Sequence, residues 1–149
     1  MNSRLFVSLF AFALLNNSCN HLNELTTNIS EANSSQSHNS GQNCVNCHKK
    51  GGDGDGWFTI SGTAYAQNNV TASNVVVNLY TQPNGKGELR KTINGDLLGN
   101  FYTTDIQAFG GGLYPAISYN GQTSYMSSSI LQGACNSCHG ISTDRISVQ

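Results

Sequence analysis

The chain has 149 residues, of which 38% are hydrophobic and 10% are charged, and its formal net charge is −1. This length suits one domain with accessory segments. The near-neutral charge excludes both the basic surface that nucleic-acid binding requires and a highly charged disordered tail. The five cysteines are an odd number, so they cannot all form disulfides within the chain. They occur as a single Cys19 followed by two closely spaced pairs.

Residues 1–18 are typical of a signal peptide. Arg4 supplies a positive charge, and the run Leu5–Leu15 has the length of a signal core but is too short to span a bilayer. Cys19 follows a small residue and resembles the processing site of bacterial lipoproteins, in which the cysteine becomes the lipidated first residue. Asn16 stands where that family usually has Leu, and the alternative is a secreted protein with a spare thiol. We therefore expect export to the periplasm, outer membrane or cell surface, with Cys19 as a lipid anchor.

Residues 19–43 are rich in Asn and Ser and show no apolar periodicity, which predicts a flexible linker. A coil of about 25 residues spans roughly 27 Å, enough to hold a domain clear of lipid headgroups. Residues 44–56 end in a run of Gly and Asp that we interpret as a hinge. A calcium loop is the alternative, but the run lacks the twelfth-position Glu of an EF-hand.

Residues 57–129 alternate between apolar and polar side chains with a period of two, which is typical of strands. In the first run, Phe58, Ile60, Gly62 and Ala64 share one face. The further strands are expected near 75–79, 88–93, 100–105, 113–119 and 123–127. The sequence therefore predicts an all-β domain, a small antiparallel β-sandwich of about six to seven strands, with a C-terminal strand in 130–149.

Turn chemistry supports these strands. Three Asn-Gly pairs, at 84–85, 94–95 and 120–121, separate the runs and suit hairpin turns that need positive φ. Pro115 cannot donate a hydrogen bond to a neighbouring strand, so we expect its strand to lie at an edge or to carry a bulge. Six strands joined only by hairpins would bring the two ends of the domain to the same side.

Four short segments of this domain, 61–65, 75–80, 99–101 and 112–114, follow one another as Ser-Gly-Thr-Ala-Tyr, Val-Val-Val-Asn-Leu-Tyr, Gly-Asn-Phe and Gly-Leu-Tyr. In this order they resemble the carboxypeptidase-regulatory-like or prealbumin-like β-sandwich family. The resemblance implies a structural, binding or adhesion module. It carries over no catalytic residues.

The domain is flanked by two C-x-x-C-H motifs, Cys44-Val45-Asn46-Cys47-His48 and Cys135-Asn136-Ser137-Cys138-His139. This spacing is the one that attaches c-type haem: the two thiols add to the two vinyl groups, and the adjacent His ligates the iron. We therefore predict two covalent haems, with Cys44, Cys47, Cys135 and Cys138 as attachment sites and His48 and His139 as proximal ligands. One alternative is a single zinc ion held by the four thiolates, which would leave the two His unexplained. The other is two local disulfides, but a pair of cysteines separated by two residues forms a strained and usually redox-active bond.

Candidates for the distal iron ligands are fewer. Met126 lies nine residues before Cys135 and is the only Met besides the initiator, but Met is also a routine core side chain. His38 lies six residues before Cys44 and is the candidate for the first haem. A thioether ligand raises the haem potential relative to a second imidazole. His21, close to the expected lipid anchor, is the weakest candidate.

These motifs resemble those of di-haem c-type cytochromes and imply electron transfer at the bacterial cell envelope, with no enzymatic bond chemistry. Loss of Arg4 with the signal leaves six basic against eight acidic residues, so we expect redox partner proteins with a basic face. Two alternatives remain open. One is a haem-based redox or gas sensor, which needs an open iron position, and the other is a surface-binding sandwich in which the haems are incidental. Self-assembly is also left open.

Overall fold

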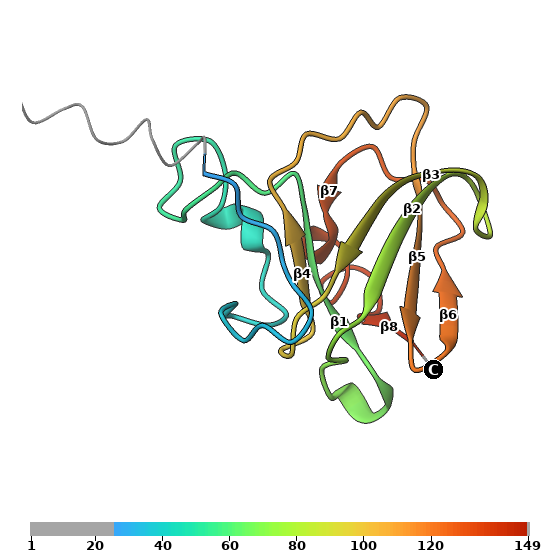
Figure 1. Ribbon diagram of the computed structural model, residues 1–149, viewed down its shortest axis with the longest axis horizontal. Coiled ribbons are helices and arrows are strands. Elements are labelled where there is room, and N and C mark those ends of the chain that lie inside the picture. The colour runs from blue at the N-terminus through green and yellow to red at the C-terminus, as the bar shows by residue number, and fades with distance from the viewer. Residues whose placement is uncertain (1–25, 149) are drawn as a thin grey trace, which may run out of the picture.

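The computed structural model describes residues 26–148, and the predicted all-β class is confirmed: these residues contain eight strands, three short 3-10 helices and no α-helix (Figure 1). The strands are β1 (Ile60–Tyr65), β2 (Val76–Gln82), β3 (Lys86–Asn94), β4 (Asn100–Thr103), β5 (Tyr114–Tyr119), β6 (Gln122–Tyr125), β7 (Gly133–Ala134) and β8 (Ile146–Ser147). The signal peptide, Cys19 and His21 lie outside the described residues.

The strands form two sheets that face each other as a small β-sandwich, as predicted (Figure 1). Sheet 1 has the order β4-β1-β7, with β8 also paired to β1, and sheet 2 has the order β3-β2-β5-β6. All pairings are antiparallel except those of β7 and β8 with β1, which are parallel. The chain crosses between the sheets after β1, β3, β4 and β6, so only β2–β3 and β5–β6 are hairpins.

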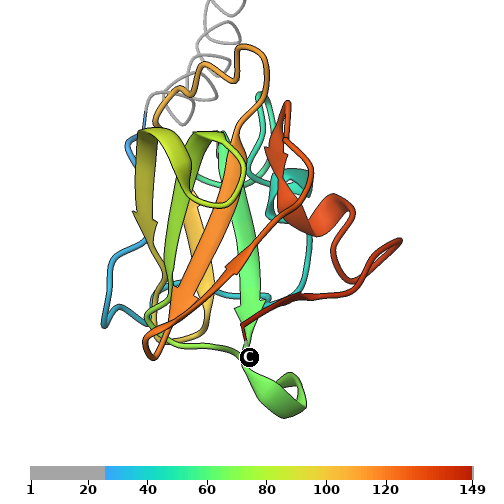
Figure 2. The ribbon, with the colours of Figure 1, turned by 90° about the vertical axis from the view of Figure 1, so that its right-hand side faces the viewer.

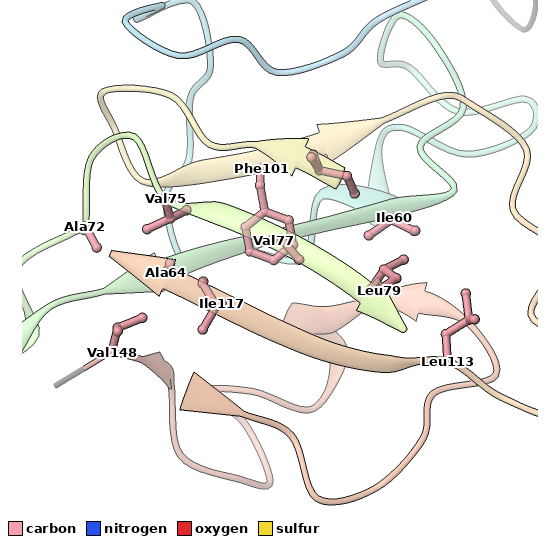
Figure 3. Packing of buried hydrophobic residues seen from close by; sticks show 11 residues of the cluster. Ile60, Ala64, Ala72, Val75, Val77, Leu79, Phe101, Leu113, Ile117 and Val148 are labelled. Carbon is pink, nitrogen blue, oxygen red and sulfur yellow. The ribbon is translucent and has the colours of Figure 1, made fainter. Parts of the chain in front are cut away.

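The core lies between the sheets and is built by the inward residues of each strand (Figure 3). Ile60 and Phe101 of sheet 1 meet Val77, Leu79 and Ile117 of sheet 2, and each of these side chains is at most 7% exposed. Burying a side chain of this size stabilises the fold by about 1.5–3 kcal/mol. The period-two alternation thus predicts the inward face of β1 correctly from Ile60 onward.

Phe58 departs from that alternation. It precedes β1 and its ring stacks on Tyr102, with ring centroids 4.7 Å apart. Tyr102 is the register partner of Ser61, so it lies on the face of sheet 1 that points away from the core. The chain before β1 therefore turns Phe58 to the outer face of sheet 1.

Two of the three Asn-Gly pairs form the expected turns. Asn84-Gly85 and Asn120-Gly121 have positive φ at both residues and join β2 to β3 and β5 to β6. Asn94 ends β3 with ordinary φ, and the chain instead passes to β4 through Gly99, which has φ 78°. The third pair is therefore not a hairpin turn.

Pro115 does not lie on an edge strand, because β5 is between β2 and β6. Its carbonyl accepts a hydrogen bond from the Met126 N–H, one residue beyond the last β5–β6 register pair. Carbonyl and nitrogen of a strand residue point to the same side, so the missing donor of Pro115 faces the point where β6 ends. The short neighbour makes an interior Pro tolerable.

The described part of the segment predicted as a linker packs on sheet 1. Ser30 is 2% exposed, its backbone N–H donates to Tyr102 O, and its hydroxyl reaches Asn94 O. The Gly/Asp run predicted as a hinge forms a tight loop, in which Gly54 N–H donates to Cys47 O and Phe58 N–H donates to His48 O. These irregular segments are held in place by hydrogen bonds, including those of Asn and Ser side chains, rather than by apolar contacts.

The second C-x-x-C-H motif is part of the edge of sheet 1. β7 pairs with Ile60 and Ser61, and β8 pairs with Ala64 and Tyr65, so residues 135–145 leave the edge between them and return. Figure 2 shows this excursion, in red, to one side of the sheets. The sequence predicts that the sandwich ends at residue 129. Because β7 and β8 belong to sheet 1, the sandwich extends beyond that residue.

Candidate functional site: two C-x-x-C-H motifs beside one strand

The first motif is a single 3-10 turn. It spans Cys44–Asn46, and the Asn43 side chain caps its start by accepting the Val45 N–H at 3.3 Å. The backbone N–H of His48 donates to Cys44 O at 2.9 Å, which brings the imidazole back beside the first cysteine. Asn is a preferred cap because its side-chain oxygen satisfies a free N–H of the first turn.

The His48 ring is held in one orientation. Its Nδ1 lies 2.9 Å from Asp55 O, and since a carbonyl only accepts, Nδ1 carries the proton and Nε2 has its lone pair free. The ring stacks on Phe58 with centroids 4.0 Å apart and planes 3° apart. A side chain at Gly54 would lie 2.7 Å from Nδ1, so glycine is required there for the loop to close on the ring.

The second motif repeats this arrangement. Its 3-10 turn spans Cys135–Ser137, and the His139 N–H donates to Cys135 O at 3.0 Å. His139 Nδ1 lies 2.7 Å from Asp144 O, so the ring presents Nε2 in the same tautomer as His48. Two segments far apart in the chain therefore adopt the same hydrogen-bonded geometry around Cys, Cys and His. A ligating His commonly donates its other ring N–H to a backbone carbonyl in this way.

The four thiols of the motifs are free and differ in their surroundings. Burial raises the pKa of Cys44, and the nearby Ser61 hydroxyl lowers it by a smaller amount. The pKa of Cys135 is raised to about 12, mainly by burial and to a smaller extent by the nearby Cys44 thiol. Cys47 and Cys138 are exposed.

This difference predicts the order of alkylation in protein produced without haem attachment. At pH 8 the raised pKa values leave little thiolate at Cys44 and Cys135, and thiolate is the reactive form. We expect Cys47 and Cys138 to react with iodoacetamide first, read out by peptide mass spectrometry over time. Denatured protein, in which all thiols are exposed, is the control. Equal rates in the folded chain would contradict the burial of Cys44 and Cys135.

The first motif opens into a pocket on the outer face of sheet 1, and most of the residues that line this pocket are polar. The pocket has a volume of about 240 Å³ and is lined by Cys44, Cys47, His48 and, from the preceding segment, His38. The rings of His38 and His48 have centroids 5.9 Å apart and planes inclined at 37°. His38, proposed from the sequence as a distal ligand, thus lies in the same pocket as the first motif.

Asn100 ties the preceding segment to this pocket, and the sequence analysis missed it. Its amide group donates to Ser37 Oγ at 2.8 Å, Ser40 Oγ at 3.1 Å and His38 O at 3.4 Å, while its oxygen accepts from Thr63 Oγ1 at 2.6 Å. The side chain is 2% exposed. No local sequence pattern identifies an Asn whose side chain forms hydrogen bonds to three residues far away in the chain. The position of Asn100 at the start of a strand, where Asn is disfavoured, is a weak signal of such a role.

The second motif opens between the sheets. A cavity of about 570 Å³ is lined by Cys135, Cys138 and His139 on one side and by core residues of both sheets on the other, namely Ile60, Phe101, Val77, Leu79 and Ile117. Met126, proposed as the second distal ligand, also lines it. This volume lies within the range of about 300–1,000 Å³ that is usual for ligand pockets, and the first pocket lies just below it.

Each candidate distal ligand therefore shares a pocket with its motif, and the two motifs occupy separate pockets. Among residues 26–148, no three His, Cys, Asp or Glu side chains gather in an arrangement that would hold a metal ion. The roles of the predicted residues as haem or iron ligands stay predictions, as does that of Cys19.

In comparisons with known proteins, no family model, no curated protein and no solved structure matches the chain. Over the part of the chain that the structure describes, no helix is long and apolar enough to cross a membrane.

Proposed function

We propose that the protein is an exported di-haem c-type cytochrome that transfers electrons at the bacterial cell envelope, anchored by lipid at Cys19. The observation that carries this proposal is the matched orientation of His48 and His139, each with Nδ1 on a backbone carbonyl and Nε2 free. Haem, when bound, supplies one-electron cycling of iron between Fe(III) and Fe(II). No substrate bond is made or broken.

The residues of both pockets suit this cofactor. The two thiols of each turn would hold the porphyrin, and the adjacent imidazole would ligate the iron through Nε2. The buried Ser61 hydroxyl at the first site lies beside the Cys44 thiol, the group that would attach the porphyrin. The second cavity is lined by core side chains that exclude water from a bound macrocycle. The sandwich serves as the rigid scaffold, in line with its resemblance to binding and structural modules.

The distal ligands are the test of electron transfer against gas sensing. We propose His38 at the first haem and Met126 at the second, because each lines the pocket of its motif. An iron with two protein ligands has no open position for a gas. The wild-type protein should therefore take up two electrons per chain in an anaerobic reductive titration, and the reduced form should not bind CO. Rapid CO binding to the wild type would favour the sensor.

Ligand substitutions should open one iron at a time. Met126→Leu keeps the side-chain volume but removes the thioether, so we expect CO to bind half of the haem and the potential of the second haem to fall. His38→Ala should open the first haem only. Each variant is the control for the other, measured by CO difference spectra and potentiometric titration. CO binding unchanged in both variants would show that other groups ligate the irons.

The redox partner is expected to carry a basic face. Without its signal the chain has an excess of acidic residues, and the haem propionates add negative charge. Complementary charge speeds encounter and is screened by salt. Electron-exchange rates with a basic partner protein should fall as ionic strength rises, and rates insensitive to salt would contradict this part of the proposal.

A further inference from the structure

The two motifs contact the same short segment of β1, Ser61-Gly62-Thr63. On the outer face of sheet 1, the Ser61 hydroxyl lies beside the Cys44 thiol. On the core face, a Cβ placed on Gly62 would lie 3.0 Å from Cys135 Cβ. Successive residues of a strand point to opposite faces. The first cysteine of one motif therefore lies against Ser61 and that of the other against the adjacent Gly62, on opposite faces of a single strand.

Thr63 ties both motifs to this segment. Its backbone N–H, at the edge left open between β7 and β8, donates to Asn136 Oδ1 at 2.8 Å, and Asn136 lies between the two cysteines of the second motif. Its hydroxyl accepts the Gly41 N–H at 2.8 Å, three residues before the first motif. Thr63 is fully buried and Asn136 is 3% exposed, so the bond between them is shielded from water.

Glycine at position 62 sets how closely the second motif approaches. A Cβ there would lie 2.5 Å from Phe101 Cζ as well as 3.0 Å from Cys135 Cβ, so any larger residue displaces one of them. The requirement is one of space, because Gly62 does not have positive φ. The pocket of the first motif and the cavity of the second are then separated by the thickness of sheet 1 alone.

We propose that Ser61-Gly62-Thr63 is a bridge that holds the two haem sites on opposite faces of one strand, close enough to exchange an electron within one molecule. The proposal rests on the proposed function, since it needs both haems. In the exchange one iron loses the electron that the other gains, with no proton and no outside reactant. Electrons would enter at the outer pocket or at the inter-sheet cavity and leave at the other, through the backbone of β1.

Circular dichroism in the Soret band tests this in the holoprotein. Two haems held close in a fixed geometry should give a couplet of opposite-signed bands centred on the absorption maximum. The signal should exceed the sum of the spectra of the two single-motif variants, C44A/C47A and C135A/C138A. Gly62→Ala should keep two haems but lose half or more of the couplet amplitude. Gly111→Ala, where an added Cβ meets nothing within 4 Å, is the matched control and should keep it.

The possible outcomes distinguish a failure of the proposed bridge from a failure of the proposed function. A chain with two haems, shown by mass, whose Soret spectrum equals the sum of the single-motif spectra would overturn the bridge and leave the cytochrome proposal standing. A chain without two haems would overturn the cytochrome proposal first. If Gly62→Ala does not accumulate as folded protein, the comparison with the single-motif variants decides alone.

Discussion

Removal of the second haem should lower the melting temperature far more than removal of the first. The second motif opens into the inter-sheet cavity, whose lining includes the core residues Ile60, Phe101 and Leu79. Without the proposed haem these side chains would lose a packing partner, much as in deletions of large core side chains, which cost about 3–5 kcal/mol. For a domain of this size that corresponds to a fall of more than about 10 °C.

The matched variants are C135A/C138A and C44A/C47A, which carry the same two substitutions at the two motifs. The first pocket lies outside the core and most of the residues that line it are polar, so its variant should melt within a few degrees of the wild type. Thermal unfolding followed by far-ultraviolet circular dichroism gives both values. Equal losses from the two variants would show that the second haem does not lie between the sheets.

Asn100→Ala should be the most damaging single polar substitution near the first site. The change removes four side-chain hydrogen bonds and leaves the buried Thr63 hydroxyl without the acceptor to which it donates. At about 1 kcal/mol net for each bond, we expect a loss of roughly 3 kcal/mol in the free energy of unfolding. Residues 36–43 should also become accessible to proteases, since Asn100 holds them on sheet 1.

Asn78→Ala is the control for this effect. Asn78 also lies in a strand, but its side chain accepts one exposed hydrogen bond, from Thr92. Its loss should cost well under about 1 kcal/mol. Urea unfolding and limited proteolysis measure the two effects, and an Asn100→Ala protein as stable and as protease-resistant as Asn78→Ala would refute the role of Asn100.

The strands with a buried face were predictable because a period of two survives in the sequence wherever one face is buried. Residues 60–65 and 76–79 show it plainly, and the turns at 84–85 and 120–121 follow from the need for positive φ. β7 and β8 were not predictable in this way, since two residues are too few to show any period. They pair with β1 through tertiary contacts alone.

Residues 26–43 show where composition misleads. A segment poor in apolar residues usually stays flexible because it cannot bury enough surface. Here the described residues are held by hydrogen bonds to distant groups instead, such as Ser30 to Tyr102 and Gly41 to Thr63. Such partners lie tens of residues away in the chain, so no local pattern reveals them.

The two C-x-x-C-H motifs could be recognised in the sequence because all their groups lie within five residues. Their surroundings were not. That one pocket lies outside sheet 1 while the other lies between the sheets depends on pairings made by β7, β8 and Asn136. The two His–carbonyl bonds likewise depend on loops of unequal length, which bring Asp55 to His48 and Asp144 to His139.

The haem content of the mature protein is the most direct test of the proposed function. Protein from a host that attaches c-type haem should show, by intact mass with a pyridine haemochrome assay, two covalent haems per chain. C44A/C47A and C135A/C138A should each retain one. A mass increase that corresponds to any other number of haems, or to a bound zinc ion without haem, would contradict the assignment of these motifs.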